Sequence, residues 1–170
     1  LSVVNLISLE RQLKLLQNAS AADVVAIREQ IARLGTAAMP FVRQKLRDTT
    51  NPRFRSRLTS VRYRLVMSAQ RSVAWSGGVD RLASPDFETR VAATSELAEQ
   101  AEKFDEALLL ELFSDPAPLV RELALKGLTR AAGSAASVSL LGLLTDEDPN
   151  VRAAVLNELT ESKSTVVAQR

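Results

Sequence analysis

Arginines at a fixed spacing are the residues of this chain whose type and pattern are best suited to specific chemistry. Arg90, Arg121 and Arg152 lie 31 residues apart, and each opens a short phrase rich in alanine with leucine or valine. A guanidinium group donates several hydrogen bonds in one plane, so such an arginine can bind a carboxylate or carbonyl of an adjacent turn, or it can meet a ligand. The register that these arginines share with core leucines favours the structural role.

The side chains that most enzymes and metal sites need are missing from the chain. It contains no Cys and no His. This excludes disulfides, cysteine nucleophiles, Ser-His-Asp triads and zinc or iron bound by histidine or thiolate, and leaves open only a metal site built from carboxylates. We therefore expect no enzyme activity, no cofactor and no metal.

Compartment is poorly constrained by the sequence. No run of 18 apolar residues is present, so we expect no membrane span. The chain begins at Leu1 and not at Met, so we expect an excised or processed piece. We favour the cytoplasm, with export left open, and the oligomeric state is not predicted.

Apolar residues repeat with the same period as the arginines and predict the helices that position them. The 31-residue step carries Leu97 to Leu128 and then to Leu159. Self-similarity at a period of this size is typical of a repeat solenoid. Aromatic residues make up only 4% of the chain, and Gly and Pro number six each, which favours closely packed helices over sheet. We expect helices over residues 3–17, 22–34, 37–47, 52–71, 86–101, 104–113, 116–131, 135–144 and 149–161, with a short one near 80–82.

The first half of the chain follows the repeated phrase less strictly than the second. Asn51-Pro-Arg-Phe-Arg55 reads like Asp148-Pro-Asn-Val-Arg152, but Arg55 lies 35 residues before Arg90. We therefore predict one repeat domain over residues 1–170. It comprises basic, less regular repeats at 1–71, a junction at 72–80 with a Trp and a Gly-Gly pair, and regular 31-residue repeats at 81–170. The tail at 162–170 reads either as a frayed end or as the start of another helix.

The repeated phrase resembles the HEAT-like repeats of bacterial proteins, the type also found in phycobilisome lyases. Asp148-Pro-Asn-Val-Arg152, its variant at 115–121 and Gly133-Ser-Ala-Ala carry the resemblance, which covers most of residues 20–161. It implies an all-α fold, a right-handed α-solenoid (superhelix) of about five antiparallel helix pairs. The family includes enzymes, adaptors and structural pieces, so the fold alone assigns no activity. No bilin-contacting motif is visible, although bilin-lyase activity stays open.

The resemblance also implies a structural ladder between neighbouring repeats. Its members would be Asp115 and Asp146 together with Arg121 and Arg152. We expect Arg55 and Arg90 to have the same structural role, because both stand in the register of the core leucines.

Positive charge is concentrated in the first half. Residues 1–80 hold 13 Lys or Arg against 5 Asp or Glu, whereas residues 81–170 hold 9 against 15. Helical spacing places four of the basic residues after Pro52 on one stripe, which we expect to be exposed. The candidate partner-binding residues are Arg43, Lys45, Arg47, Arg53, Arg57, Arg64, Arg71 and Trp75.

Three interpretations of the basic surface stay open. It can be an ordinary solvated helix face, a site for an acidic protein or peptide, or a site for nucleic acid, for which the stacking aromatics are missing. Trp75 can plug the junction or serve as a contact hot spot. We predict a non-catalytic protein-interaction scaffold, part of a larger protein, that binds an acidic partner through its basic first half. The alternatives are a nucleic-acid-binding module and a purely structural arm.

Overall fold

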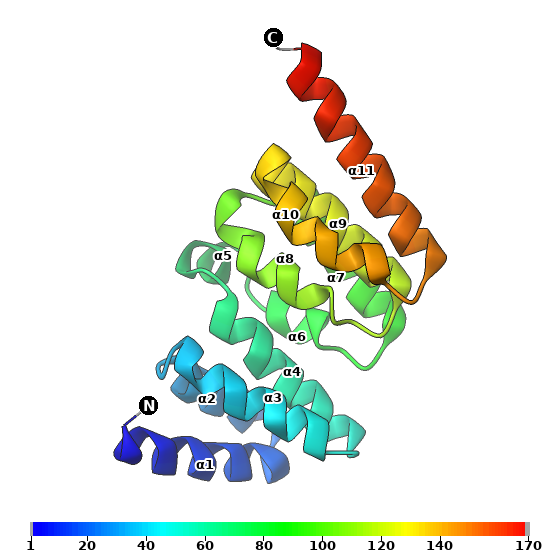
Figure 1. The fold of residues 1–170 in the computed structure, drawn as a ribbon. Coiled ribbons are helices and arrows are strands. Elements are labelled where there is room, and N and C mark those ends of the chain that lie inside the picture. The colour runs from blue at the N-terminus through cyan, green and yellow to red at the C-terminus, as the bar shows by residue number, and fades with distance from the viewer. Residues whose placement is uncertain (1, 169–170) are drawn as a thin grey trace. The chain divides into compact units, whose positions relative to one another are not determined.

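The computed structural model describes residues 2–168, which form helices and turns with no β-strand in that range. The all-α fold predicted from the sequence is therefore confirmed (Figure 1). The chain divides into two compact units. The first unit comprises Leu1–Met67 and Trp75–Asp86, and the second comprises Ser68–Ala74 and Phe87–Arg170.

The first unit is built mainly from four helices around one apolar core. Its elements are α1 (Val3–Asn18), α2 (Ala21–Ala32), the 3-10 turn η1 (Thr36–Ala38), α3 (Met39–Asp48), α4 (Pro52–Val66) and the short α6 (Gly78–Leu82). Helices α1 and α2 pack as one pair and α3 and α4 as the next, while α2 also stacks on α4. Leu9, Leu13 and Leu16 of α1 meet Leu58 and Val61 of α4 in this core.

Helix starts in the first unit follow the residues that the sequence offers as caps. The hydroxyl of Ser20 accepts a hydrogen bond from the backbone of Asp23 at 3.2 Å, and the amide oxygen of Asn51 accepts one from Phe54 at 3.0 Å. Pro52 occupies the first position of α4, where its missing N–H costs nothing. Gly35 follows α2 with a φ of 69°, a conformation that glycine adopts without strain.

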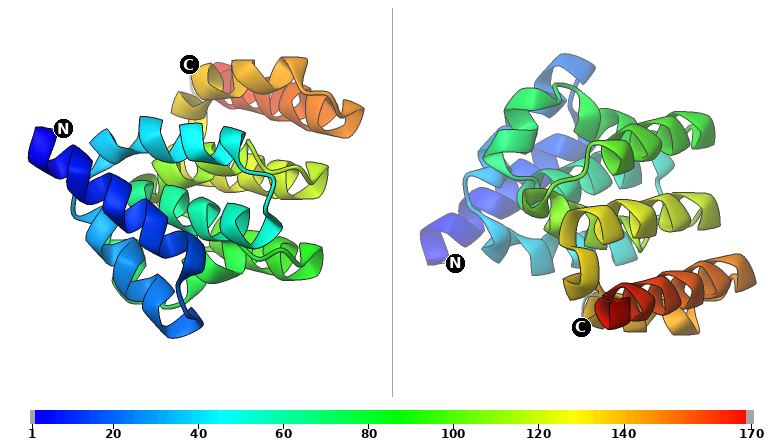
Figure 2. Two further views of the ribbon diagram at one scale, coloured as in Figure 1. Left: turned by 90° about the horizontal axis from the view of Figure 1, so that it is seen from below. Right: turned by 90° about the horizontal axis from the view of Figure 1, so that it is seen from above.

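The second unit repeats the same construction. Its elements are α5 (Ala69–Ala74), α7 (Phe87–Glu99), η2 (Lys103–Asp105), α8 (Glu106–Leu112), α9 (Pro118–Ala132), η3 (Gly133–Ala136), α10 (Ser137–Leu140), η4 (Leu141–Thr145) and α11 (Pro149–Ala168). Helices α7, α9 and α11 stack side by side, as the right-hand view of Figure 2 shows. Helix α8 pairs with α9, and α10 with η4 pairs with α11.

Three expectations about local structure differ from what is observed. The single helix expected over 52–71 is wrong, because α4 ends at Val66, Met67 is extended, and the Ser68 hydroxyl then caps α5. The segment expected as a helix at 135–144 is a short α-turn between two 3-10 turns. Helix α11 runs past residue 161 to Ala168, while residues 169–170 lie outside the described range.

Neither of the two compact units is one continuous stretch of the chain. The chain passes from the first unit to the second after Met67, returns at Trp75, and passes again after Asp86. The physical reason is that Arg71 of α5 is bound to Asp105 of the second unit, whereas Trp75 packs within the first.

Candidate protein-interaction surface

Arg121 forms the most complete set of contacts among the ladder residues. Its Nε and Nη2 atoms donate to the two carboxylate oxygens of Asp146 at 2.9 and 2.7 Å, and its Nη1 donates to the carbonyl of Asp115 at 2.8 Å. The side chain is only 4% exposed. Arg121 therefore links the turn before α9 to the turn before α11.

Arg90 and Arg152 occupy the neighbouring positions of this ladder. Arg90 donates from Nε to Oδ2 of Asp115 at 3.0 Å. Arg152 donates from Nη1 to the carbonyl of Asp146 at 2.7 Å. The carboxylates of Asp115 and Asp146 are thus bound by the arginine 25 residues earlier, and their carbonyls by the arginine six residues later.

Arg55 repeats the second of these contacts in the first unit. Its Nη1 atom donates to the carbonyls of Leu46 and Thr49 at 2.8 and 3.0 Å. Thr49 lies six residues before Arg55, the same offset that separates Asp115 from Arg121 and Asp146 from Arg152. The four arginines in register therefore all bind groups of the fold itself, and Arg55 does so from an exposed position.

The charges of the ladder also reinforce each other. Burial alone would raise the pKa of Asp146, but hydrogen bonds from Arg121 and from the Asp148 backbone, together with the nearby arginine charges, hold that pKa below its usual value. The hydrogen bond to Asp146 correspondingly raises the pKa of Arg121, against the opposing effect of burial. This pair is ionised at neutral pH.

Arg57 does not lie on an exposed basic face, so the expectation for this residue is wrong. It is buried, and its guanidinium donates to the carbonyls of Leu16, Gln17 and Ala19 at 2.8, 3.0 and 2.7 Å. These carbonyls belong to the C-terminal end of α1, where no further helical N–H reaches them. Burial and the charge of Arg53 lower the pKa of Arg57.

Arg71 is also buried, which contradicts the exposed stripe predicted for it. Its Nε and Nη2 atoms bind both carboxylate oxygens of Asp105 at 2.9 and 2.6 Å, and Nη2 also donates to the carbonyl of Gln100 at 2.8 Å. The Asp105 side chain is fully buried. Because this pair is enclosed, Arg71 is not available to a partner.

Arg64 is half-buried and takes part in an ion-pair network. Its Nη2 lies 2.8 Å from Oε2 of Glu29, and Glu29 also approaches Arg28 at 3.9 Å. Arg28, in turn, binds the carboxylate of Asp80. Arg64 thus joins α4 to α2, and its charge is partly compensated.

Trp75 is 7% exposed, so it does not offer the surface contact that a hot spot requires. Its ring covers Gly78 so closely that a Cβ at that glycine would lie 2.2 Å from the ring. The guanidinium of Arg81 lies 5.1 Å from the ring centroid. These contacts make Trp75 a plug within the first unit.

The remaining four candidates are exposed and lie on α3 and at the start of α4. We call Arg43, Lys45, Arg47 and Arg53 the α3–α4 basic rim. Lys45 and Arg47 stand in the last turn of α3, a favourable place for cations because of the helix dipole. Arg47 donates to the side chain of Gln44, which itself donates to Asp48.

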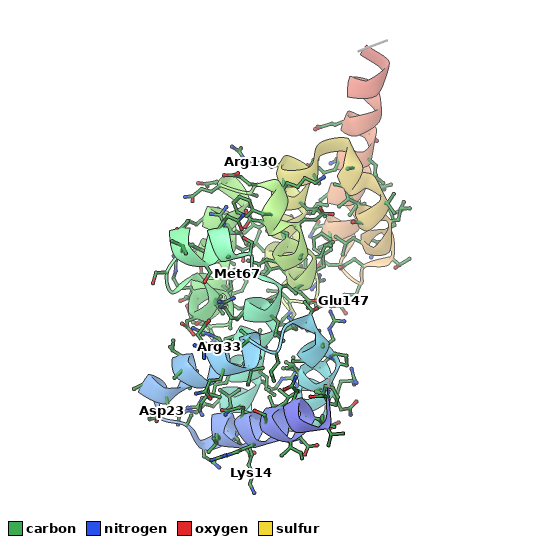
Figure 3. All side chains as sticks on the ribbon, turned by 90° about the vertical axis from the view of Figure 1, so that its left-hand side faces the viewer. Lys14, Asp23, Arg33, Met67, Arg130 and Glu147 are labelled. Carbon is green, nitrogen blue, oxygen red and sulfur yellow. The ribbon has the colours of Figure 1, made fainter. Side chains whose placement is uncertain are left out.

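A groove beside this rim contains residues that the sequence reasoning missed. It has a volume of about 410 Å³ and joins α1 to α3 and α4. Lys14 of α1 and Lys45 of α3 both line it, over a floor that includes Leu13 and Phe54. Lys14 points away from the body of the unit (Figure 3). Its position opposite the leucine stripe of α1 was the signal in the sequence that could have identified it.

The described residues contain neither a metal site nor a membrane span. No group of three or more Asp or Glu side chains is arranged to hold a metal ion. No described helix has the length and apolar character needed to cross a bilayer.

Comparison with known proteins agrees with the construction of the second unit. Residues 105–170 match the family model of HEAT repeats, which covers α8 to α11 and includes Asp115, Arg121, Asp146 and Arg152. No curated protein matches the chain, and no solved structure matches it either. The resemblance predicted from the arginine phrase is therefore confirmed over residues 105–170, which match HEAT repeats.

Proposed function

We propose that this chain is a non-catalytic scaffold that binds an acidic protein or peptide through the α3–α4 basic rim. HEAT repeats in general serve as protein-interaction scaffolds, since stacked helix pairs present extended binding surfaces. The observation that carries the finer proposal is that Arg43, Lys45, Arg47 and Arg53 are exposed and lie together on α3 and at the start of α4, whereas Arg57 and Arg64 are bound within the unit.

The groove beside the rim favours a partner that adds apolar contacts to charge pairing. Phe54 and Leu13 provide an apolar floor, while Lys14 and Lys45 stand at its edges. An apolar side chain flanked by carboxylates fits this combination, because the floor takes the apolar group and the lysines pair with the acids. Glu10 also lines the groove and disfavours a partner that is acidic throughout.

The proposal is tested with a pair of labelled peptides of equal length. One alternates leucine with glutamate, and the other replaces each glutamate by glutamine. Fluorescence anisotropy should show binding of the acidic peptide and at least about tenfold weaker binding of the neutral one. The variant with Arg43→Glu, Lys45→Glu, Arg47→Glu and Arg53→Glu should lose the acidic peptide.

A control variant reverses two exposed charges outside the rim and is compared with a rim variant that also reverses two, Lys45→Glu with Arg47→Glu. Lys126→Glu with Arg130→Glu changes two exposed cations of the second unit. This variant should bind the acidic peptide as the unmodified chain does. Equal loss of peptide binding in the rim variant and the control, or binding by the rim variant as tight as that of the unmodified chain, would contradict the proposal.

Nucleic-acid binding through the same rim is the second candidate function. Single-stranded binding sites normally add aromatic stacking. Trp75 and Tyr63 are both buried, whereas Phe41 of α3 is 37% exposed. A salt titration with a labelled DNA duplex separates the two. Nucleic-acid binding predicts a log–log slope of about −0.9 per phosphate contacted.

A further inference from the structure

The helix pairs of each unit stack through one helix of each pair. In the second unit α9 lies between α7 and α11, and in the first unit α2 stacks on α4. The contact between α7 and α9 depends on small side chains, since a Cβ added at Gly127 would lie 3.0 Å from the Cα of Ala98. Close stacking in this fold thus uses residues with little or no side chain.

Helix α2 presents a second face of this kind that the first unit leaves exposed. Ala22 and Ala26 lie on it, and Val25 is 47% exposed. A groove of about 620 Å³ runs between this face and α1, lined by Ala26, Ile27 and Leu15 among other residues. Leu15 is itself 48% exposed.

Gln12 of α1 also lines this groove. The side-chain oxygen of Gln12 is buried and has no hydrogen-bond partner among the described residues. Arg11 and Lys14 line the α1 side of the groove, and Asp23 lines the α2 side.

Helix α11 exposes a matching face in the second unit. Leu156 is 56% exposed, and Ala153 and Asn157 beside it on the same face are exposed as well. This face has a small residue for close approach, one apolar side chain and one amide donor. Its apolar side chain and its small residue therefore match Leu15, Ala26 and Ile27 of the α1–α2 groove.

The charges of the two units favour contact between unlike units of different copies. The first unit holds 13 Lys or Arg and 6 Asp or Glu, and the second holds 9 and 14, so their net charges are +7 and −5. An interface between two first units would bring together like charges, whereas an interface between a first and a second unit brings together opposite ones.

We propose that the α1–α2 groove receives the exposed face of α11 from a second copy of this chain. Leu156 packs against Leu15 and Ile27. The contact joins two different surfaces, so it is heterologous, and copies add head to tail.

The test uses variants that block one surface each. Leu15→Glu with Ala26→Glu blocks the groove, and Ala153→Glu with Leu156→Glu blocks the α11 face; circular dichroism confirms that each folds. Light scattering after size-exclusion chromatography should show an unmodified chain whose mass rises with concentration beyond a dimer. Each blocked variant alone should be a monomer, with association at least about tenfold weaker.

Mixing the two blocked variants gives the decisive result. Each retains one intact surface, so the mixture should form a dimer and nothing larger. Val138→Glu, a change at an apolar residue that is 78% exposed elsewhere, should associate as the unmodified chain does. A monomeric unmodified chain at all concentrations, or a dimer formed by either blocked variant alone, would overturn the proposal. A rim variant with Arg43→Gln, Lys45→Gln, Arg47→Gln and Arg53→Gln leaves the first unit with 9 Lys or Arg and 6 Asp or Glu, a net charge of +3, and should still associate, which separates this inference from the proposed function.

Discussion

Replacing Arg57 by alanine should destabilise the first unit and should not act as a binding mutation. The Arg57 guanidinium is buried and is the donor to three carbonyls at the end of α1. Its neighbour Arg53, four residues earlier on the same helix, is exposed. The two arginines share a stripe by helical spacing, so they form a matched pair for comparing a structural with a solvent-facing cation.

The magnitude follows from the three hydrogen bonds. A hydrogen bond to a charged group contributes about 1.5–3 kcal/mol. The bonds do not add fully, because water reaches part of a helix end once the guanidinium is gone, so we expect a loss of about 3 kcal/mol. With a urea m-value of about 2 kcal/mol per M, the unfolding midpoint should fall by about 1.5 M.

The assay can be confined to the unit in question. Trp75 is the only Trp in the chain and belongs to the first unit, so its fluorescence reports unfolding there. Arg53→Ala should lower the free energy of unfolding by no more than about 0.5 kcal/mol and so leave the urea midpoint nearly unchanged. Arg57→Lys should lose an intermediate amount, since an ammonium cannot reach three carbonyls at once. Equal midpoints for Arg57→Ala and Arg53→Ala would refute the reasoning.

Two further predictions concern single residues, Asp146 and Gly78. The pKa of Asp146 is held low in the folded state, so its stabilisation is present above the unfolded pKa of about 3.9 and is lost as pH falls through the lower folded value. Asp146→Asn should therefore lower the urea midpoint at pH 7, and this difference from the unmodified chain should shrink below about pH 4. Gly78→Ala should displace the Trp75 ring and shift its emission to longer wavelength, at a cost of about 1–3 kcal/mol. Gly77→Ala, with a φ of 73° and open space around it, should cost about 1 kcal/mol with the emission unchanged.

Much of the fold could be predicted because its signals are local and repeated. Leu97 and Leu128 recur at the same step as Arg90 and Arg121, and both leucines are buried. Prolines and cap residues marked most helix starts. The break at Met67 was missed because residues 52–71 carry no Gly or Pro after Pro52, and only Ser68 signals that a new helix begins.

The candidate surface was harder to predict because α4 is enclosed on several sides. Helical spacing separates an apolar stripe from a basic one, and on an isolated amphipathic helix the basic stripe faces water. Here α4 packs against α1, α2, α3 and α6, so residues on both stripes are covered. Which arginines remain exposed depends on where neighbouring helices end, and one sequence position does not contain that information.

The two kinds of turn in this fold are completed by different residues, and this explains why so many arginines are engaged internally. Helices α2 and α9 end at glycines with positive φ, Gly35 and Gly133. The turns before α4, α9 and α11 have no such glycine, and an arginine in the early part of the following helix donates to their carbonyls instead. Arg57 does the same for the end of α1. An arginine that donates to the carbonyls of such a turn is therefore part of the backbone hydrogen bonding, whereas the α3–α4 basic rim consists of exposed cations on α3 and at the start of α4.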